Sequence, residues 1–207
     1  MIYELALVAK PESSDDQVKS LTDLVQSVIT EFKGESLLTD DWGKLQFAQP
    51  TKSGGVAGRF LYFIFKTNEE GTNKELQRRF GINEQVLRNM IVKLGEDADQ
   101  EKILKKYKCP YSKTSNGSVV DEGDDKEGAK ERRRFAKRRA CWFTAKDIKA
   151  DWKDPKTFGW LINEFGKISP ARVSGISRKH QRFADSAIKQ ARNIGIASYV
   201  SNRFAAE

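Results

Sequence analysis

The feature that most constrains the fold of this chain is the order of hydrophobic periodicities in residues 1–94. Short apolar runs rich in strand-forming residues are typical of strands, and runs with apolar residues three or four apart are typical of helices. Strands are expected at residues 2–8, 36–48, 59–67 and 86–94, and helices from a cap at Ser13 or Ser14 to Gly34 and at residues 73–80. This order predicts an α+β domain with the ferredoxin-like βαββαβ fold, in which a four-stranded antiparallel sheet carries both helices on one face.

The third expected strand has apolar side chains on both of its faces. A sheet with one wetted face needs apolar residues on the other face only. Here two apolar sets alternate, with Phe60, Tyr62 and Ile64 on one face and Leu61, Phe63 and Phe65 on the other. We therefore expect something to dock on this sheet or its edge.

Residues 1–94 also contain several short motifs. They are Tyr3-Glu4, Trp42-Gly43-Lys44 followed by Ala48 and Pro50, and Ile82-Asn83 followed by Val86-Leu87-Arg88 and Val92-Lys93. Together these motifs resemble bacterial small-subunit ribosomal protein S6 over nearly the whole length of that family. The resemblance implies a domain that binds a protein partner.

Residues 95–130 lose this periodicity and are rich in Asp, Glu, Lys, Gly and Ser, with an acidic run at residues 121–127. Such a composition predicts a flexible acidic linker. Within it, Ile103, Leu104 and Tyr107 are spaced to form one helical turn that docks. As a coil, a segment of this length spans about 30 to 35 Å, so the parts that it joins can touch each other.

The charge of the chain is concentrated in its last third. The net charge is −1 for residues 1–94, −2 for residues 95–130 and +11 for residues 131–207. This asymmetry predicts that the last third binds nucleic acid or an anionic membrane surface. We divide the chain accordingly into a ferredoxin-like domain (1–94), a linker (95–130) and a small, mostly helical basic domain (131–207).

The basic domain begins with an arginine-rich arm at residues 132–139, followed by Trp142 and Phe143, and the combination of arginines and aromatic rings suits phosphates and exposed bases. A helix is expected at residues 156–165, capped by Asp154 and Pro155 and ended by Gly166. Its predicted packing residues are Phe158, Leu161, Ile162 and Phe165.

A second helix is expected within residues 175–194, capped by Ser174 or Ser177 and ended by Gly195. At helical spacing this segment has two chemically opposed faces. The packing face contains His180, Phe183, Ala184, Ala187, Ala191 and Ile194, and the basic face contains Arg178, Arg182, Lys189 and Arg192. Because Asp185 is the one acid of the basic face, we expect that face to meet an anionic partner.

The basic domain carries a second set of ordered motifs. They are Asp151-Trp152-Lys153-Asp154, Gly166-Lys167-Ile168, Pro170 with Arg172, Gly175, Lys179 with Gln181-Arg182, and Ala187-Ile188-Lys189 with Ala191-Arg192. These motifs resemble small-subunit ribosomal protein S18 over residues 131 to about 200. The resemblance implies rRNA binding by Arg132, Arg133, Arg134, Lys137, Arg138, Arg139, Arg172, Arg178, Lys179, Arg182, Lys189 and Arg192.

Zinc-binding members of that family carry C-x-x-C and C-x-x-H pairs, for which this chain has Cys141-x-x-Thr144 and Ser177-x-x-His180. Two of the four ligands remain, and structural zinc requires four. We therefore predict no metal and no other cofactor, and expect His180 to lie on the packing face near Cys141. Cys109 and Cys141 form no disulfide framework.

The two resemblances together imply a covalently joined pair that serves as a structural constituent of the small ribosomal subunit and binds the central domain (platform) of its rRNA. The implied partners are this rRNA, neighbouring small-subunit proteins and, by intramolecular docking, the other domain of the chain. No apolar run reaches the roughly 18 to 20 residues that span a bilayer, so we expect a cytoplasmic protein in the ribosome.

Two other classes of function compete. Residues 58–65 (GRFLYFIF) resemble the aromatic third strand of an RNA-recognition motif, which suggests a non-ribosomal regulator that binds single-stranded RNA. The −1 charge of that domain argues against this alternative. An enzyme is disfavoured by the single histidine and by the lack of a phosphate-binding glycine loop.

Overall fold

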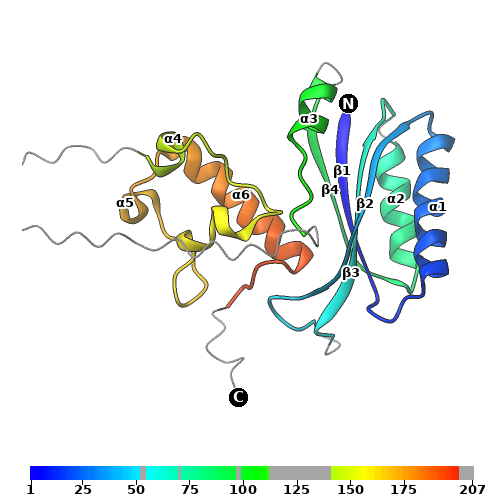
Figure 1. Cartoon of the computed structure of the whole chain (residues 1–207), viewed down its shortest axis with the longest axis horizontal. Helices are drawn as coiled ribbons and strands as arrows, with labels where there is room; N and C mark the ends of the chain where they lie inside the picture. Colours follow the sequence, from blue (N-terminus) through cyan, green and yellow to red (C-terminus); the bar gives the residue numbers. More distant parts are fainter. Residues whose placement is uncertain (52–54, 70, 97–98, 112–140, 201–207) are drawn as a thin grey trace, which may run out of the picture.

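The computed structural model describes residues 1–51, 55–69, 71–96, 99–111 and 141–200 (Figure 1). We call residues 1–96 the front part and residues 141–200 the rear part. The predicted arginine arm at residues 132–139 and the acidic run at residues 121–127 lie outside the described residues.

The front part has the predicted ferredoxin-like fold. Its elements are β1 (Ile2–Ala9), α1 (Asp15–Glu31), β2 (Glu35–Gln46), β3 (Ala57–Lys66), α2 (Gly71–Ile82) and β4 (Val86–Gly95). The strands form one sheet in the order β2-β3-β1-β4, and every neighbouring pair is antiparallel. Both long helices cover the same face of this sheet (Figure 1), so the predicted topology is confirmed.

Local chemistry sets the bounds of these helices. Ser14 caps α1, accepting a hydrogen bond from the backbone N–H of Gln17, while the Gln17 side chain accepts one from the backbone N–H of Ser14. The helix ends at Glu31, ahead of Lys33 with a φ of 53°. The second helix, predicted at residues 73–80, is longer at both ends, since α2 runs from Gly71 to Ile82.

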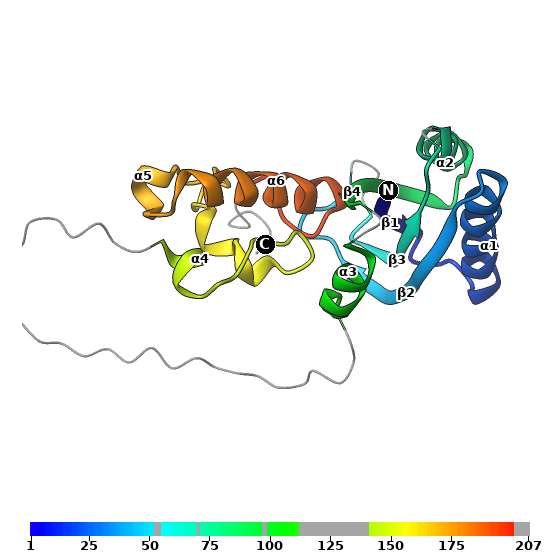
Figure 2. The same cartoon turned by 90° about the horizontal axis from the view of Figure 1, so that it is seen from above.

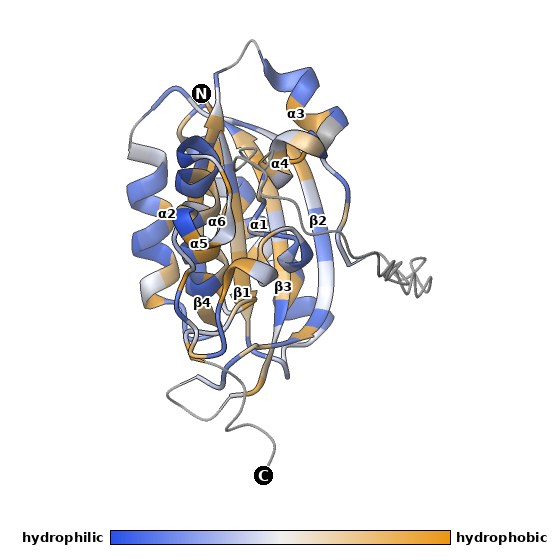
Figure 3. Cartoon of the chain, turned by 90° about the vertical axis from the view of Figure 1, so that its left-hand side faces the viewer, coloured by the Kyte–Doolittle hydropathy of each residue, from blue (hydrophilic) through white to orange (hydrophobic). Residues whose placement is uncertain are grey.

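The two central strands, β1 and β3, are mostly hydrophobic (Figure 3), because each of their faces packs into a core. One core lies between the sheet and the long helices and includes Leu5 and Phe63, which are register partners on β1 and β3. The other lies on the opposite face and joins Phe60, Tyr62 and Ile64 to buried residues of the rear part. The residues that cover this second face come from residues 99–111 and 141–200, on the side away from α1 and α2 (Figure 2).

The first residues of the predicted linker are structured, in contrast to the prediction of a flexible segment from residue 95. Residues Gln100–Lys106 form helix α3. Ile103, Leu104 and Tyr107, which were expected to form a docked turn, pack against the core on the second sheet face. Their burial offsets the conformational entropy that a charged, weakly apolar segment loses when it becomes ordered. Residues 112–130 lie outside the described residues.

The rear part contains two short helices, α4 (Trp142–Ala145) and α5 (Ala171–Ser174), two 3-10 turns, η2 (Pro155–Thr157) and η3 (Gly159–Leu161), and the long helix α6 (Arg178–Ile194). The predicted helix at residues 156–165 is therefore wrong. Asp154 does cap Pro155–Thr157, but Ile162 bridges Ile168 as a strand pair. The Asn163 side chain accepts hydrogen bonds from the N–H groups of Phe165 and Lys167, and this turn replaces the last helical turn.

Candidate nucleic-acid interface

Helix α6 carries the basic face on which the nucleic-acid prediction depends. Of the two candidate caps, Ser177 is the one used, and its hydroxyl accepts a hydrogen bond from the backbone N–H of His180 at 3.3 Å. Gly195 ends the helix with a φ of 94°, in the left-handed region that favours glycine. A Cβ atom at this position would also lie 2.8 Å from the Phe47 ring of the front part.

The buried stripe of α6 consists of Ala184, Ala187, Ile188, Ala191 and Ile194. The assignment of Phe183 to this stripe is wrong, because its side chain is 45% exposed. At about 100° per residue, Phe183 lies at the margin of the stripe, whereas Ile188 lies within it. The small alanines let the helix approach the rest of the rear part closely.

The predicted rRNA-binding residues of α6 lie opposite that stripe. Arg178, Arg182, Lys189 and Arg192 fall within an arc of about 80° around the helix at 100° per residue. Arg178, Arg182 and Lys189 are exposed, as are Lys179 on this helix and Arg172 on α5. Asp185 is the one acid of this face, and it forms an ion pair with Lys189 at 2.7 Å. The structure thus leaves five of the predicted cations exposed on the surface of the rear part.

Arg192 differs from the other predicted contacts. Its Nε donates to the carbonyl of Ser198 at 3.0 Å, another guanidinium nitrogen donates to the carbonyl of Gly166, and the group lies over the ring of Tyr199. These contacts tie the segment after the helix to the turn at Gly166. The remaining predicted residues, Arg132, Arg133, Arg134, Lys137, Arg138 and Arg139, lie outside the described residues.

Cys141 and His180 meet at the start of α6, as the sequence predicts. The Cys141 Sγ atom lies 3.2 Å from His180 Nδ1 and accepts a hydrogen bond from the N–H of Ser177 at 3.3 Å. Burial opposes ionisation of this thiol, but hydrogen bonds from Ser177, Thr144 and His180 outweigh it and lower the pKa of Cys141 to about 6. Among the described residues, no group of three or more His, Cys, Asp or Glu side chains is arranged to hold a metal ion.

Not every aromatic residue of the rear part is available to a base. Phe143 is buried and packs against the His180 ring at a centroid distance of 5.6 Å, so its predicted role in stacking on bases is wrong. Trp142 is half-buried beneath Trp160, which is 44% exposed. The sheet face required by the RNA-recognition-motif alternative is also covered, because Phe60 and Tyr62 are buried.

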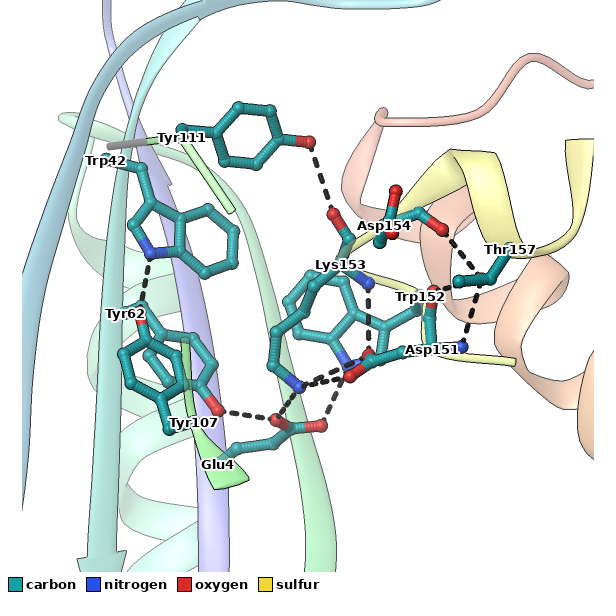
Figure 4. Close-up of polar contacts among 10 residues, drawn as sticks. All are labelled: Glu4, Trp42, Tyr62, Tyr107, Tyr111, Asp151, Trp152, Lys153, Asp154 and Thr157. Atoms are coloured by element: carbon teal, nitrogen blue, oxygen red, sulfur yellow. Dashed lines mark hydrogen bonds and ion pairs between the residues drawn. The ribbon is translucent and has the colours of Figure 1, made fainter. Parts of the chain in front are cut away.

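A buried carboxylate connects the front and rear parts. Glu4 on β1 is 2% exposed and accepts hydrogen bonds from the Tyr62 hydroxyl and from the Trp152 indole, both at 2.7 Å (Figure 4). Lys153 Nζ completes the arrangement as an ion pair at 2.8 Å. Burial and the Glu4 carboxylate raise the pKa of Tyr62 well above its usual range, so the hydroxyl remains a donor near neutral pH.

Sequence reasoning missed this contact, although a signal was present. Glu4 interrupts an apolar strand, and a charged residue is rarely buried without a partner. In the sequence, the residues that bind it, Trp152 and Lys153, stand out only as part of a family motif. A separation of 148 residues along the chain gives no indication of which residue would be the partner.

A second contact joins the end of α6 to the front part. Arg88 on β4 donates a hydrogen bond to the carbonyl of Asn193 at 2.8 Å and lies over the Phe47 ring. The N–H of Ala48 donates to the carbonyl of Gly195 at 2.9 Å. Figure 2 shows the C-terminal end of α6 beside β4.

Among the described helices, none has the length and apolar character needed to cross a membrane.

Comparison with known proteins divides the chain in the same way. Residues 2–93 match the family model described as ribosomal protein S6, and residues 146–197 match the one described as ribosomal protein S18. A small ribosomal subunit protein bS18 from Geotalea uraniireducens is 47% identical over 70 residues, which are 33% of this chain and 77% of that protein. A small ribosomal subunit protein bS6 from Geobacter sulfurreducens is 37% identical over 97 residues, 47% of this chain and 81% of that protein.

Among solved structures, ribosomal protein S6 from Thermotoga maritima aligns with a TM-score of 0.43 and 21% identity, covering 51% of this chain and 94% of that one.

Proposed function

We propose that this chain, which belongs to the ribosomal protein families S6 (residues 2–93) and S18 (residues 146–197), binds the central domain (platform) of the small-subunit rRNA as a fused pair. Membership of these families makes it a structural protein of the small ribosomal subunit. The families are not enzymatic, in agreement with the sequence prediction.

The observation that carries the rRNA proposal is the large excess of positive charge on the exposed face of α6, where Asp185 is the one acid. Arg178, Arg182 and Lys189 lie opposite a buried alanine-rich stripe, so the helix is held with its cations outward. Ordinary solvent-exposed faces mix both signs of charge. Arg172 and Lys179 are further exposed cations of the rear part, and the arm at residues 132–139 belongs to the same basic domain in the sequence.

We assign different tasks to the two parts. Residues 1–94, with a net charge of −1, serve as a protein-binding platform, and residues 131–207, with a net charge of +11, bind the rRNA. Intramolecular docking is supported by the contacts of Glu4 with Trp152 and Lys153 and by the apolar core that the two parts share. Neighbouring small-subunit proteins are further partners, and the protein acts in ribosomes of the cytoplasm.

A salt titration of rRNA binding tests this proposal. The full chain is bound to a central-domain fragment of small-subunit rRNA, and the slope of log K against log salt is compared with that of the Arg178→Gln/Arg182→Gln variant. Each lost phosphate contact reduces the slope by about 0.7 to 0.9, so we expect a reduction of about 1.5.

The matched control is Lys19→Gln/Lys74→Gln, which removes two exposed cations from α1 and α2, on the far side of the sheet. The control should keep the slope of the unaltered chain. If both double variants reduce the slope equally, binding reflects overall charge, and the assignment of the rRNA contact to α6 is wrong.

A further inference from the structure

We propose that residues 99–111, which we call the clamp, are a third docking element that fastens the rear part to the sheet. This inference rests on the proposed function in one respect, because it takes the two parts to act as a docked pair. The clamp lies outside both matched ranges, 2–93 and 146–197, so neither family match accounts for it. Its partner is the rear part of the same chain.

The clamp is anchored to the front part through Tyr107. The Tyr107 ring stacks on Tyr62 with a centroid distance of 5.0 Å and an interplanar angle of 5°. Its hydroxyl accepts a hydrogen bond from the Trp42 indole at 2.9 Å (Figure 4). The same hydroxyl donates one to Asp40 at 2.5 Å. Trp42 is 5% exposed, and a buried donor without an acceptor is costly, so the sheet face is incomplete without the clamp.

The clamp also reaches the rear part, through Tyr111. The Tyr111 ring lies 5.4 Å from that of Trp42, and its hydroxyl lies 3.4 Å from the carbonyl oxygen of Lys153. Trp42 in turn contacts the Trp152 ring at 5.9 Å. Trp152 and Lys153 are the residues that bind Glu4, so the same dipeptide is held by β1 from one side and by the clamp from another (Figure 4).

These contacts form a connected set. Tyr107 covers Tyr62, Tyr62 donates to Glu4, and Glu4 binds the rear part. By packing on Tyr62 and orienting Trp42, the clamp preorganises the surface that the rear part meets, and preorganisation strengthens binding without new contacts. The partner that fits this surface is the Trp152-Lys153 segment.

The test cuts the chain without removing any described residue. A protease recognition sequence is inserted after Ser118, the purified full chain is cleaved, and dissociation of the two fragments is measured on dilution. Tyr107→Ala/Tyr111→Ala should weaken fragment association at least tenfold. The control, Lys102→Ala/Lys105→Ala, changes exposed side chains of α3 and should stay within twofold of the unaltered chain.

The single variant Tyr111→Ala separates weaker association of the fragments from unfolding of the front part. Tyr111→Ala leaves the Tyr107 hydrogen bonds in place and should still weaken association several-fold. If Tyr111→Ala and the double variant both associate within twofold of the unaltered chain, the clamp proposal is overturned. Failure of the uncut chain to bind rRNA would instead contradict the proposed function, and the fragment measurement would be unaffected.

Discussion

At the scale of single residues, Cys141 should ionise near neutral pH. Because its pKa is lowered to about 6, its alkylation by iodoacetamide should rise with pH around a midpoint near 6. The measurement uses the Cys109→Ser variant, so that Cys141 is the thiol that is alkylated. Burial raises the pKa of Cys109, and its slower alkylation at higher pH would otherwise distort the curve. Replacing His180 with Asn removes one stabilising hydrogen bond and should move the midpoint upward. A midpoint near 8.5 in the unaltered chain would contradict the hydrogen-bonded thiolate.

The lowered pKa of Cys141 also makes the free energy of unfolding depend on pH. The pKa of Cys141 is lower in the folded chain than the 9.0 of a free thiol, so the unfolded chain binds more protons between these values. The thiolate therefore stabilises the fold fully above pH 9, and this contribution is lost as the pH falls through about 6. The Cys141→Ser variant should lose this pH-dependent part of the free energy of unfolding.

Glu4 and Lys153 provide a second prediction for single residues. Lys153→Met leaves a carboxylate buried without its cation, and breaking a buried pair in this way costs about 3 to 5 kcal/mol. Adding Glu4→Gln to that variant should restore much of the loss, because the Trp152 and Tyr62 hydrogen bonds then meet a neutral acceptor. Urea unfolding gives both free energies. Exposed Lys156→Met serves as the control, and an equal loss from it would exclude a specific role for the buried pair.

At the scale of secondary-structure elements, the start of α6 depends on its cap. Ser177→Ala removes the acceptor for the N–H of His180 and should lower the free energy of unfolding by about 0.5 to 2 kcal/mol. Ser186→Ala, at an exposed position within the same helix, is the control and should leave stability nearly unchanged or slightly raised. Equal effects of the two substitutions would show that the cap is not used in solution.

The elements also show where sequence patterns suffice. The sheet and both long helices of the front part follow from the sequence pattern, since the apolar run in β3 and the three- and four-residue spacing in α1 extend over many residues. Residues 156–165 have helical spacing of apolar residues too, yet Asn163 forms a local turn that competes with the helix. Side-chain hydrogen bonds of this kind leave no mark on hydrophobic periodicity.

The candidate site was predictable to a similar degree. The basic face of α6 follows from spacing alone, because one helix contains both of its faces. Glu4 and Tyr111 acquire their roles from residues far along the chain, and their partners depend on how the rear part meets the sheet. Arg192 likewise donates hydrogen bonds to the carbonyls of Gly166 and Ser198 instead of facing rRNA, and the spacing of the helix does not predict these partners.

At the scale of the whole molecule, the shared core couples the stability of the two parts. Phe60 and Tyr62 of the front part and Phe158 and Ile188 of the rear part lie in one cluster of buried residues. A unit shorter than about 70 to 80 residues rarely gains more than 3 to 5 kcal/mol from its own core, and the rear part is smaller than that. The rear part should therefore remain folded only while it is docked on the sheet.

Native-state hydrogen exchange of the full chain tests this coupling. In the unaltered chain, the buried amides of α6 should open with the free energy of undocking the rear part from the sheet, because their protection depends on the shared core. Trp152→Ala should lower the opening free energy of α6 and leave β3 protected by its second core beneath α1 and α2. Phe165→Ala, which removes a 74% exposed ring of the rear part, should change neither. If Trp152→Ala leaves the opening free energy of α6 unchanged, the rear part is stable without docking on the sheet, and the shared core does not couple the two parts.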